Sequence, residues 1–352
     1  MKSISGCVMV VAVSVCLSAQ GRPPASQGPD STIKPLQVLE SVVVKSQPGE
    51  SMQLPVRCDD TGNIYVRFFH GRVPFKEPVI KFDSKGQRQA AYSITDDPDF
   101  QGRGQGALDF SIGSGGEVYF LATTLLQDQI ADFIVPFSSD GKLRPKMKLE
   151  DNFTRDRFGV FGSGNFLVTG TGRETEANAT PHSIHNEIVD SGGKLVKKLI
   201  LPEDAKYEEA ANRGDSDFFE LERGGGGNYA VERGMLTRGS DGNLYMLRWT
   251  VPAQVYVISP SGELLHSFEV TAQLEGKKPA SIHADGGHVA IQFEGNDKYR
   301  RSLIAVVGLD GREYATYDST GLGVAFACYS EPDRFTFLKG GDQLQIITYA
   351  PK

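Results

Sequence analysis

One short phrase recurs through the chain and constrains its fold more than any other feature. It is a turn of small and acidic residues followed by a run of β-forming residues. The copies occupy Asp59–Phe68, Gly113–Ala122, Gly162–Gly170, Gly239–Trp249, Ala284–Phe293 and Ser330–Leu338. The last three copies are 45 residues apart, counted from Asn243 to His288 and to Asp333. A period of this length indicates a fold built from similar units.

A second phrase follows each of the first five copies. It is a β-run, a turn that ends in glycine and another β-run, and the turn glycines are Gly86, Gly141, Gly193, Gly262 and Gly311. Alternation within Val255–Val270 (VYVISPSGELLHSFEV) is the period-two signal of strands. Each unit is therefore expected to be a meander of four short strands, A to D. Six units predict an all-β, six-bladed β-propeller over residues 37–352, with four-stranded antiparallel blades.

The two ends of the repeat region are expected to share one blade. The sixth unit ends after QLQIITYAPK and lacks a fourth strand, whereas the run Leu39–Lys45 (LESVVVK) precedes the first A strand. An N-terminal strand would complete the last blade and remove the open sheet edges.

The stretch Asp241–Phe268 resembles the NHL-type repeat of six-bladed propellers, which reads D-x-x-G-x-[IL]-Y-V-x-D and then V-x-V-F-x-x-x-G. The similarity is strong in the fourth and first units and weaker elsewhere. The Asp that usually follows strand B is replaced by Arg248 and Trp249 in the fourth unit. The resemblance implies the fold and not a function.

The first residues are expected to direct export. Residues 1–19 combine Lys2 with a short apolar run and end in Ser18-Ala19, as a cleaved signal peptide does. Lipid anchoring at Cys16 is the less favoured alternative. Residues 20–36 are rich in Pro, Ser and Gly and predict a linker. The mature chain is then secreted, or periplasmic in the cell envelope, and has no membrane span.

Charge and cysteine content narrow the function further. A formal net charge of −7 disfavours nucleic-acid binding, which requires a basic face. Cys58 and Cys328 occupy equivalent positions in the first and sixth units, which are neighbours in a closed ring. They either form a disulfide after export or remain two buried thiols, and the sequence leaves both open.

Length variation points to one rim as the functional face. The A–B and C–D turns are short, whereas the B–C and D–A connections vary, and both of these connections emerge on the same rim of a meander. Variable loops on a rigid scaffold commonly carry binding. We expect polar and aromatic ligand contacts there, around the channel mouth. The candidates are Arg67, Asp109, Arg157, Arg248 and Trp249.

Enzymatic and metal-binding alternatives have weaker support. His182 and His185 could ligate zinc with Glu187 or His283, but no known spacing is complete, so no metal and no cofactor are predicted. Asp59–Asn63 is better explained as a hydrogen-bonded turn than as a calcium loop. Five residues before the start of each B strand come Cys58, Ile112, Val160, Arg238, His283 and Cys328. One His and no carboxylate in this column disfavour the metal sites of propeller lactonases and lyases.

The sequence thus predicts a secreted propeller that binds a small molecule, a glycan or a protein. The alternative is a metal-dependent, lactonase-like hydrolase or lyase with its site at the channel mouth, where calcium or zinc would be the cofactor. A third interpretation is one component of a cell-envelope assembly.

Overall fold

The protein is described here by a computed structural model. It covers residues 33–44, 51–69, 75–102, 106–126, 129–150, 153–172, 183–213, 231, 234–250, 252–270, 277–295, 301–340 and 343–352. The signal-like segment and His182 lie outside the described residues. Residues Ile33–Lys352 belong to one compact unit.

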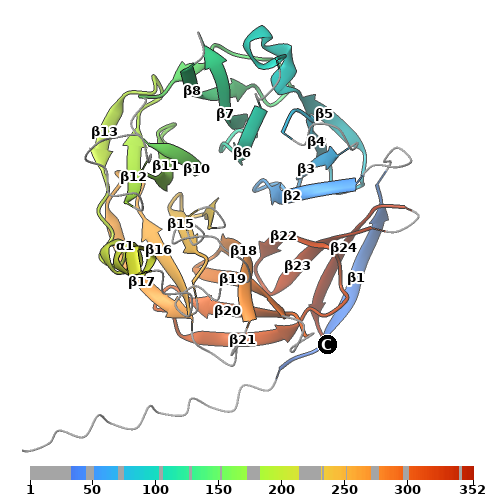
Figure 1. Ribbon diagram of the computed structural model, residues 1–352. Helices are drawn as coiled ribbons and strands as arrows, with labels where there is room; N and C mark the ends of the chain where they lie inside the picture. The colour runs from blue at the N-terminus through green and yellow to red at the C-terminus, as the bar shows by residue number, and fades with distance from the viewer. Residues whose placement is uncertain are drawn as a thin grey trace, which may run out of the picture. The chain divides into compact units, whose positions relative to one another are not determined.

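Six four-stranded antiparallel sheets form this unit, which confirms the predicted six-bladed β-propeller (Figure 1). Blade 1 contains β2 (Ser51–Cys58), β3 (Ile64–Phe69), β4 (Val79–Phe82) and β5 (Arg88–Tyr92). Blade 2 contains β6 (Gly106–Ile112), β7 (Val118–Leu126), β8 (Gln129–Phe137) and β9 (Met147–Lys148). Blade 3 contains β10 (Thr154–Val160), β11 (Phe166–Thr171), β12 (Ile184–Val189) and β13 (Leu195–Lys198).

The second half of the ring has the same organisation. Blade 4 contains β14 (Met235–Arg238), β15 (Leu244–Arg248), β16 (Ala253–Ile258) and β17 (Leu264–Val270). Blade 5 contains β18 (Lys277–Asp285), β19 (His288–Gly295), β20 (Leu303–Gly308) and β21 (Glu313–Asp318). Blade 6 contains β22 (Ala325–Ser330), β23 (Arg334–Lys339), β24 (Gln345–Pro351) and β1 (Leu36–Val43). The α-helix α1 (Asp204–Arg213) and two short 3-10 helices, η1 (Ile94–Asp96) and η2 (Pro98–Phe100), lie in connections between blades.

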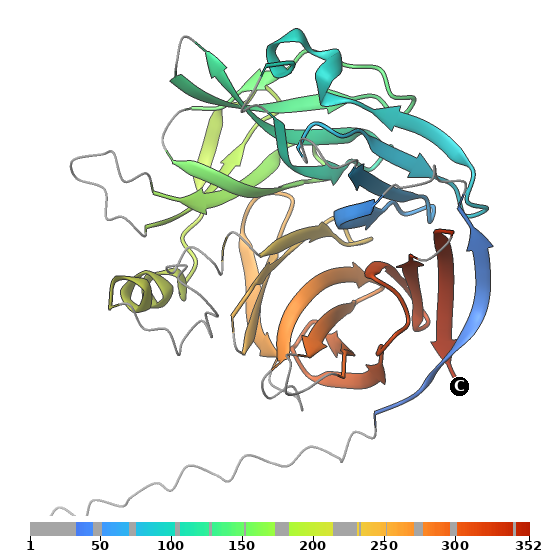
Figure 2. The same ribbon diagram turned by 45° about the vertical axis from the view of Figure 1, so that its right-hand side comes forward.

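The chain ends meet in blade 6, as expected from the incomplete sixth repeat. β1 pairs antiparallel with β24, from Leu36 opposite Pro351 to Val43 opposite Gln345 (Figure 2). The observed strand begins three residues before the predicted run and ends two residues before its end. The innermost strands of blades 1 and 6, β2 and β22, are in contact, so the ring is closed.

Most turns on one rim share the same hydrogen bonds, and we call this rim the turn rim. In the first A–B turn the Asp59 amide donates to Asn63 O and the Gly62 amide donates to Asp59 O. The same pair of bonds closes turns that start at Asp59, Asp83, Gly113, Ser138, Phe161, Asp190, Gly239, Ser259 and Gly308. Gly62 has a φ of +80°, which explains why glycine recurs at this position. The opposite rim carries the B–C and D–A connections and is the long-loop rim.

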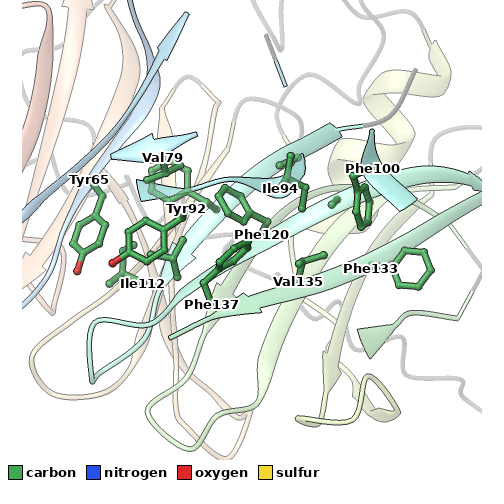
Figure 3. Packing of buried hydrophobic residues seen from close by; sticks show 14 of the residues in the cluster. Tyr65, Val79, Tyr92, Ile94, Phe100, Ile112, Phe120, Phe133, Val135 and Phe137 are labelled. Carbon is green, nitrogen blue, oxygen red and sulfur yellow. The ribbon is translucent and has the colours of Figure 1, made fainter. Parts of the chain in front are cut away.

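Aromatic and aliphatic side chains fill the space between adjacent blades. Between blades 1 and 2, Tyr92 packs edge-on against Phe137, and Phe137 packs edge-on against Phe120 (Figure 3). Burial of these large rings contributes to the hydrophobic driving force for blade packing.

Bulges interrupt five of the six innermost strands. The register shifts between Gln53 and Arg57, Ala107 and Asp109, Arg155 and Arg157, Pro279 and Ser281, and Phe326 and Cys328. A bulge adds a residue to one strand and re-aims the side chains that follow it. The residues after three of these bulges, Arg57, Asp109 and Cys328, contribute to the contacts at the channel described below.

Candidate functional site

Arg57 crosses the central channel from blade 1. Its Nη1 donates to Leu236 O of blade 4 at 2.6 Å, and its Nη2 lies 3.1 Å from Asp109 Oδ1 of blade 2. The guanidinium also lies 5.6 Å from the Phe110 ring centroid. Because blades 1 and 4 are opposite each other in a ring of six, this side chain ties together the two halves of the propeller.

Asp109 is fully engaged within the protein. Besides Arg57, its Oδ1 accepts the amide of Phe110 at 2.8 Å, and its Oδ2 accepts the amide of Phe158 at 3.5 Å. The carboxylate is buried, so these donors replace its hydration. The structure places Asp109, a predicted ligand contact, at the channel. Its carboxylate forms an internal ion pair with Arg57.

A second arginine crosses the channel nearer the turn rim. Arg238, at the end of β14, donates from Nη2 to Asp60 Oδ2 at 2.8 Å, and Asp60 lies in the first A–B turn of blade 1. The Arg238 side chain is 9% exposed, whereas that of Asp60 is 57% exposed. The ion pair therefore joins a buried cation to a carboxylate at the protein surface.

The two arginines line a cavity of 390 Å³ at the turn-rim end of the channel, which we call the channel cavity. All innermost strands run toward the turn rim, and the A–B turns of blades 1, 4, 5 and 6 surround the cavity. Other residues that line the cavity are Ser111, Thr237, Val56, Ile112, Met235 and Ile282. A cavity of this size falls at the lower end of the range for small-molecule sites.

His283 contributes a neutral imidazole to the cavity wall. Its Nε2 is 3.2 Å from Phe326 O, and its ring packs edge-on against the Phe326 ring. Burial lowers the pKa of His283 to about 4, and the charge of Arg57 lowers it in the same direction. The ring is therefore uncharged near neutral pH.

Cys58 and Cys328 also line the cavity and form a disulfide in this structure. Their Cα atoms are 5.7 Å apart, and the bond joins the innermost strands of blades 1 and 6. It lies beside the seam at which the ring closes.

Arg67 lies between blades 1 and 2 rather than at an open mouth. Its Nη1 donates to Ala107 O at 3.0 Å, and its guanidinium is 5.9 Å and 5.8 Å from the centroids of Phe110 and Phe120. Burial lowers the pKa of Arg67 to about 10. This environment indicates a packing role.

Arg248 holds the start of helix α1. Its guanidinium donates to Asn186 Oδ1 at 2.8 Å, to Thr169 Oγ1 at 3.1 Å and to Asp204 Oδ1 at 3.2 Å. Burial raises the pKa of Asp204, whereas the charge of Arg248 opposes this rise. The predicted contact residue thus joins blade 4 to blade 3 and to the first residue of α1.

Arg157 and Trp249 lie closer to the predicted rim. Arg157 Nε donates to Gly234 O at 2.9 Å, and Nη1 donates to Asp156 O at 2.9 Å. Trp249 follows β15, is partly exposed, and has the Lys278 ammonium 5.6 Å from its ring centroid. The five predicted contact residues therefore do not form one cluster in the described contacts.

The described residues among the candidate metal ligands contact other protein groups. The His185 ring stacks on Phe153 with 4.9 Å between centroids, and its Nε2 is 3.1 Å from Ser183 Oγ. Glu187 Oε1 is 3.6 Å from Lys198 Nζ. No group of three or more His, Cys, Asp or Glu residues that could hold a metal ion occurs among the described residues.

The Asp59–Asn63 segment has the hydrogen bonds of a turn. Asp59 Oδ1 accepts the amides of Thr61 and Asn63, each at 3.0 Å, and Tyr65 donates its hydroxyl to Oδ2 at 2.9 Å. Burial raises the pKa of Asp59, but these hydrogen bonds outweigh it and hold the pKa below its usual value. The carboxylate serves the turn.

Sequence reasoning missed Arg57 and Asp60 and did not propose Arg238 as a contact. The signal was nevertheless present in the aligned column five residues before the start of each B strand. Five of its six members line the channel cavity, namely Cys58, Ile112, Arg238, His283 and Cys328. The column marks the channel wall, but it does not show which side chains reach across to another blade.

Comparisons with known proteins identify the fold and no family. No family model and no curated protein matches the chain. A protein of unknown function from Dyadobacter fermentans has a TM-score of 0.51 at 11% identity, covering 90% of this chain and 99% of that one. The likeness is one of fold.

Other solved structures are more distant. Virginiamycin B lyase from Staphylococcus aureus has a TM-score of 0.47 at 13% identity, covering 89% of this chain and 99% of that one. A putative TolB from Agrobacterium tumefaciens has a TM-score of 0.45 at 12% identity, covering 89% and 97%. Membership of the NHL-repeat family stays a prediction. None of the helices in the described ranges has the length and apolar character needed to cross a bilayer.

Proposed function

We propose that the protein is an exported binding module that contacts a partner through the long-loop rim of its propeller. The observation that carries this proposal is a set of exposed apolar side chains on the described part of that rim. Phe75, Leu125, Ile130 and Val324 belong to connections or strand ends of blades 1, 2 and 6. Leu125 and Ile130 are adjacent, and adjacent exposed apolar side chains are more typical of interaction sites than scattered ones.

The β7–β8 hairpin is the most prominent of these elements. Both strands are nine residues long, and Leu125 pairs directly with Ile130 near the hairpin tip. The pair presents two adjacent aliphatic side chains on a backbone held by cross-strand hydrogen bonds. A preformed apolar contact of this kind loses little conformational entropy on binding.

The uniformity of the turn rim also supports the proposal that binding takes place on the long-loop rim. Nine turns there share one hydrogen-bonding pattern, whereas the connections on the long-loop rim differ in length and include α1. Export is proposed from the signal-like residues 1–19 and the linker after them. Because the sequence Asp241–Phe268 resembles an NHL repeat, we also propose that the blades are NHL-like.

The test is the double variant Leu125→Ser and Ile130→Ser. Cross-linking of the exported protein in its producing cells should capture a partner with the unmodified chain and at least about fivefold less with the variant, because two apolar contacts are lost. The matched control is Leu265→Ser with Tyr314→Ser, which removes two exposed apolar side chains from the outer strands β17 and β21. The control should retain capture.

Equal capture by both variants would contradict the proposal. Stoichiometric zinc or calcium in the purified protein, lost together with a hydrolase or lyase activity on chelation, would favour the enzymatic alternative instead.

A further inference from the structure

The channel cavity opens on the rim opposite the hairpin and is lined by two buried arginines that the proposed function does not use. The Arg57 and Arg238 side chains are each 9% exposed and both line the cavity. Within the described residues, Arg57 Nε and Arg238 Nη1 are buried and have no hydrogen-bond partner. A buried donor without an acceptor is costly, and native proteins rarely retain one without a reason.

The two arginines differ in how firmly their acid partners are fixed. Asp109, the partner of Arg57, is buried and accepts two backbone amides. Asp60, the partner of Arg238, lies in an exposed turn, and Arg238 is its only ion-pair partner among the described residues. An ion pair with an exposed carboxylate contributes little to stability, so Asp60 can be replaced at low cost.

The rest of the wall indicates what else a ligand must carry. Ile112 and the partly exposed Met235 are apolar residues of the wall, whereas Val56 and Ile282 are 3% and 1% exposed and pack between blades. His283, whose imidazole is neutral, Ser111 and Thr237 are its polar residues. The cavity wall also includes two other carboxylates, but both have partners. Asp59 accepts hydrogen bonds within its own turn, and Asp285 Oδ2 accepts the Glu331 amide at 3.0 Å.

We propose that the channel cavity binds a small monocarboxylic acid with an apolar body, whose carboxylate takes the place of Asp60 on Arg238. The guanidinium offers planar, paired N–H donors that match a carboxylate. The apolar part lies against Met235 and Ile112. Asp60 turns to solvent, where its charge is hydrated, so binding exchanges one acid partner of Arg238 for another.

The probes are benzoate and hexanoate, with benzamide and hexanamide as neutral counterparts of the same shape. Isothermal titration of the full exported chain should show both acids binding, and the amides binding at least about tenfold more weakly, because an ionised hydrogen bond is lost. Arg238→Gln should weaken binding of the acids by at least about tenfold for the same reason.

Asp60→Asn provides the decisive second variant because the residue is exposed and its loss does not perturb packing. Removing the competing charge should tighten binding of the acids by about two- to fivefold, the range expected for release of an exposed ion pair. The matched control is Asp310→Asn with Arg312→Gln, an exposed pair in a C–D turn of blade 5. It should leave binding unchanged.

Absence of binding by both acids at millimolar concentration would overturn the proposal, and so would equal binding of acids and amides. An unchanged affinity in Asp60→Asn would also overturn it, even if Arg238→Gln failed to fold. The hairpin variant Leu125→Ser with Ile130→Ser should bind benzoate normally, so failure of the rim proposal and failure of the cavity proposal are distinguishable.

Discussion

At the scale of single residues, charged side chains form ion pairs inside the ring as well as on its surface. Among the described residues, three buried arginines pair with buried carboxylates outside their own blade: Arg57 with Asp109, Arg155 with Asp132 and Arg248 with Asp204. Desolvation makes such groups expensive unless each is paired, so loss of one partner leaves an uncompensated charge. The predicted contact residues Asp109 and Arg248 belong to this internal set. A sequence shows that they are charged, but not that the neighbouring blade covers them.

At the scale of single residues, the buried His283 predicts how stability depends on pH. Its pKa is about 4 in the folded protein and 6.5 in an unfolded chain, so the unfolded state binds more protons between these values. The stability that depends on the neutral ring is complete above pH 6.5 and is lost as the pH falls toward 4. Urea denaturation should show a decrease of up to about 3 kcal/mol in this window beyond that of a His283→Gln variant. Parallel curves for the two proteins would contradict this assignment.

At the scale of elements, strand order was predictable and channel contacts were not. The glycine turns and period-two runs indicated four strands in each unit, as the structure shows. The bulges had no local signal, yet they re-aim Arg57 and Asp109. The contact between Arg57 and Leu236 links residues 179 positions apart and depends on the curvature of the whole ring. No local sequence pattern predicts a contact between residues so far apart in the chain.

At the scale of elements, the disulfide between β2 and β22 leads to a testable prediction. The Cys58–Cys328 disulfide encloses a separation of 270 residues and restricts the unfolded chain strongly. Cys58→Ser with Cys328→Ser should lower the free energy of unfolding by about 2–5 kcal/mol. Alkylation of the denatured exported protein should label no cysteine before reduction and both afterwards. Two thiols that react without reduction would contradict the bridge.

At the scale of the whole molecule, the ring joins a uniform rim to a variable one. The turn rim has repeated hydrogen bonds and surrounds the channel cavity, whereas the long-loop rim carries the exposed hairpin side chains. Closure holds both rims in place, because every blade packs against two neighbours and no inner strand lacks a partner blade. The pairing of β1 with β24 is the step on which this arrangement depends.

The most direct measurement is therefore the thermal unfolding of two N-terminal truncations. Removal of residues 1–43 deletes β1 and exposes the edge of β24, whereas removal of residues 1–32 keeps the strand and serves as the control. The longer truncation should melt at least about 5 °C below the control and self-associate through the open edge. Equal melting temperatures and a monomeric state for both truncations would contradict closure of the propeller by its N-terminal strand.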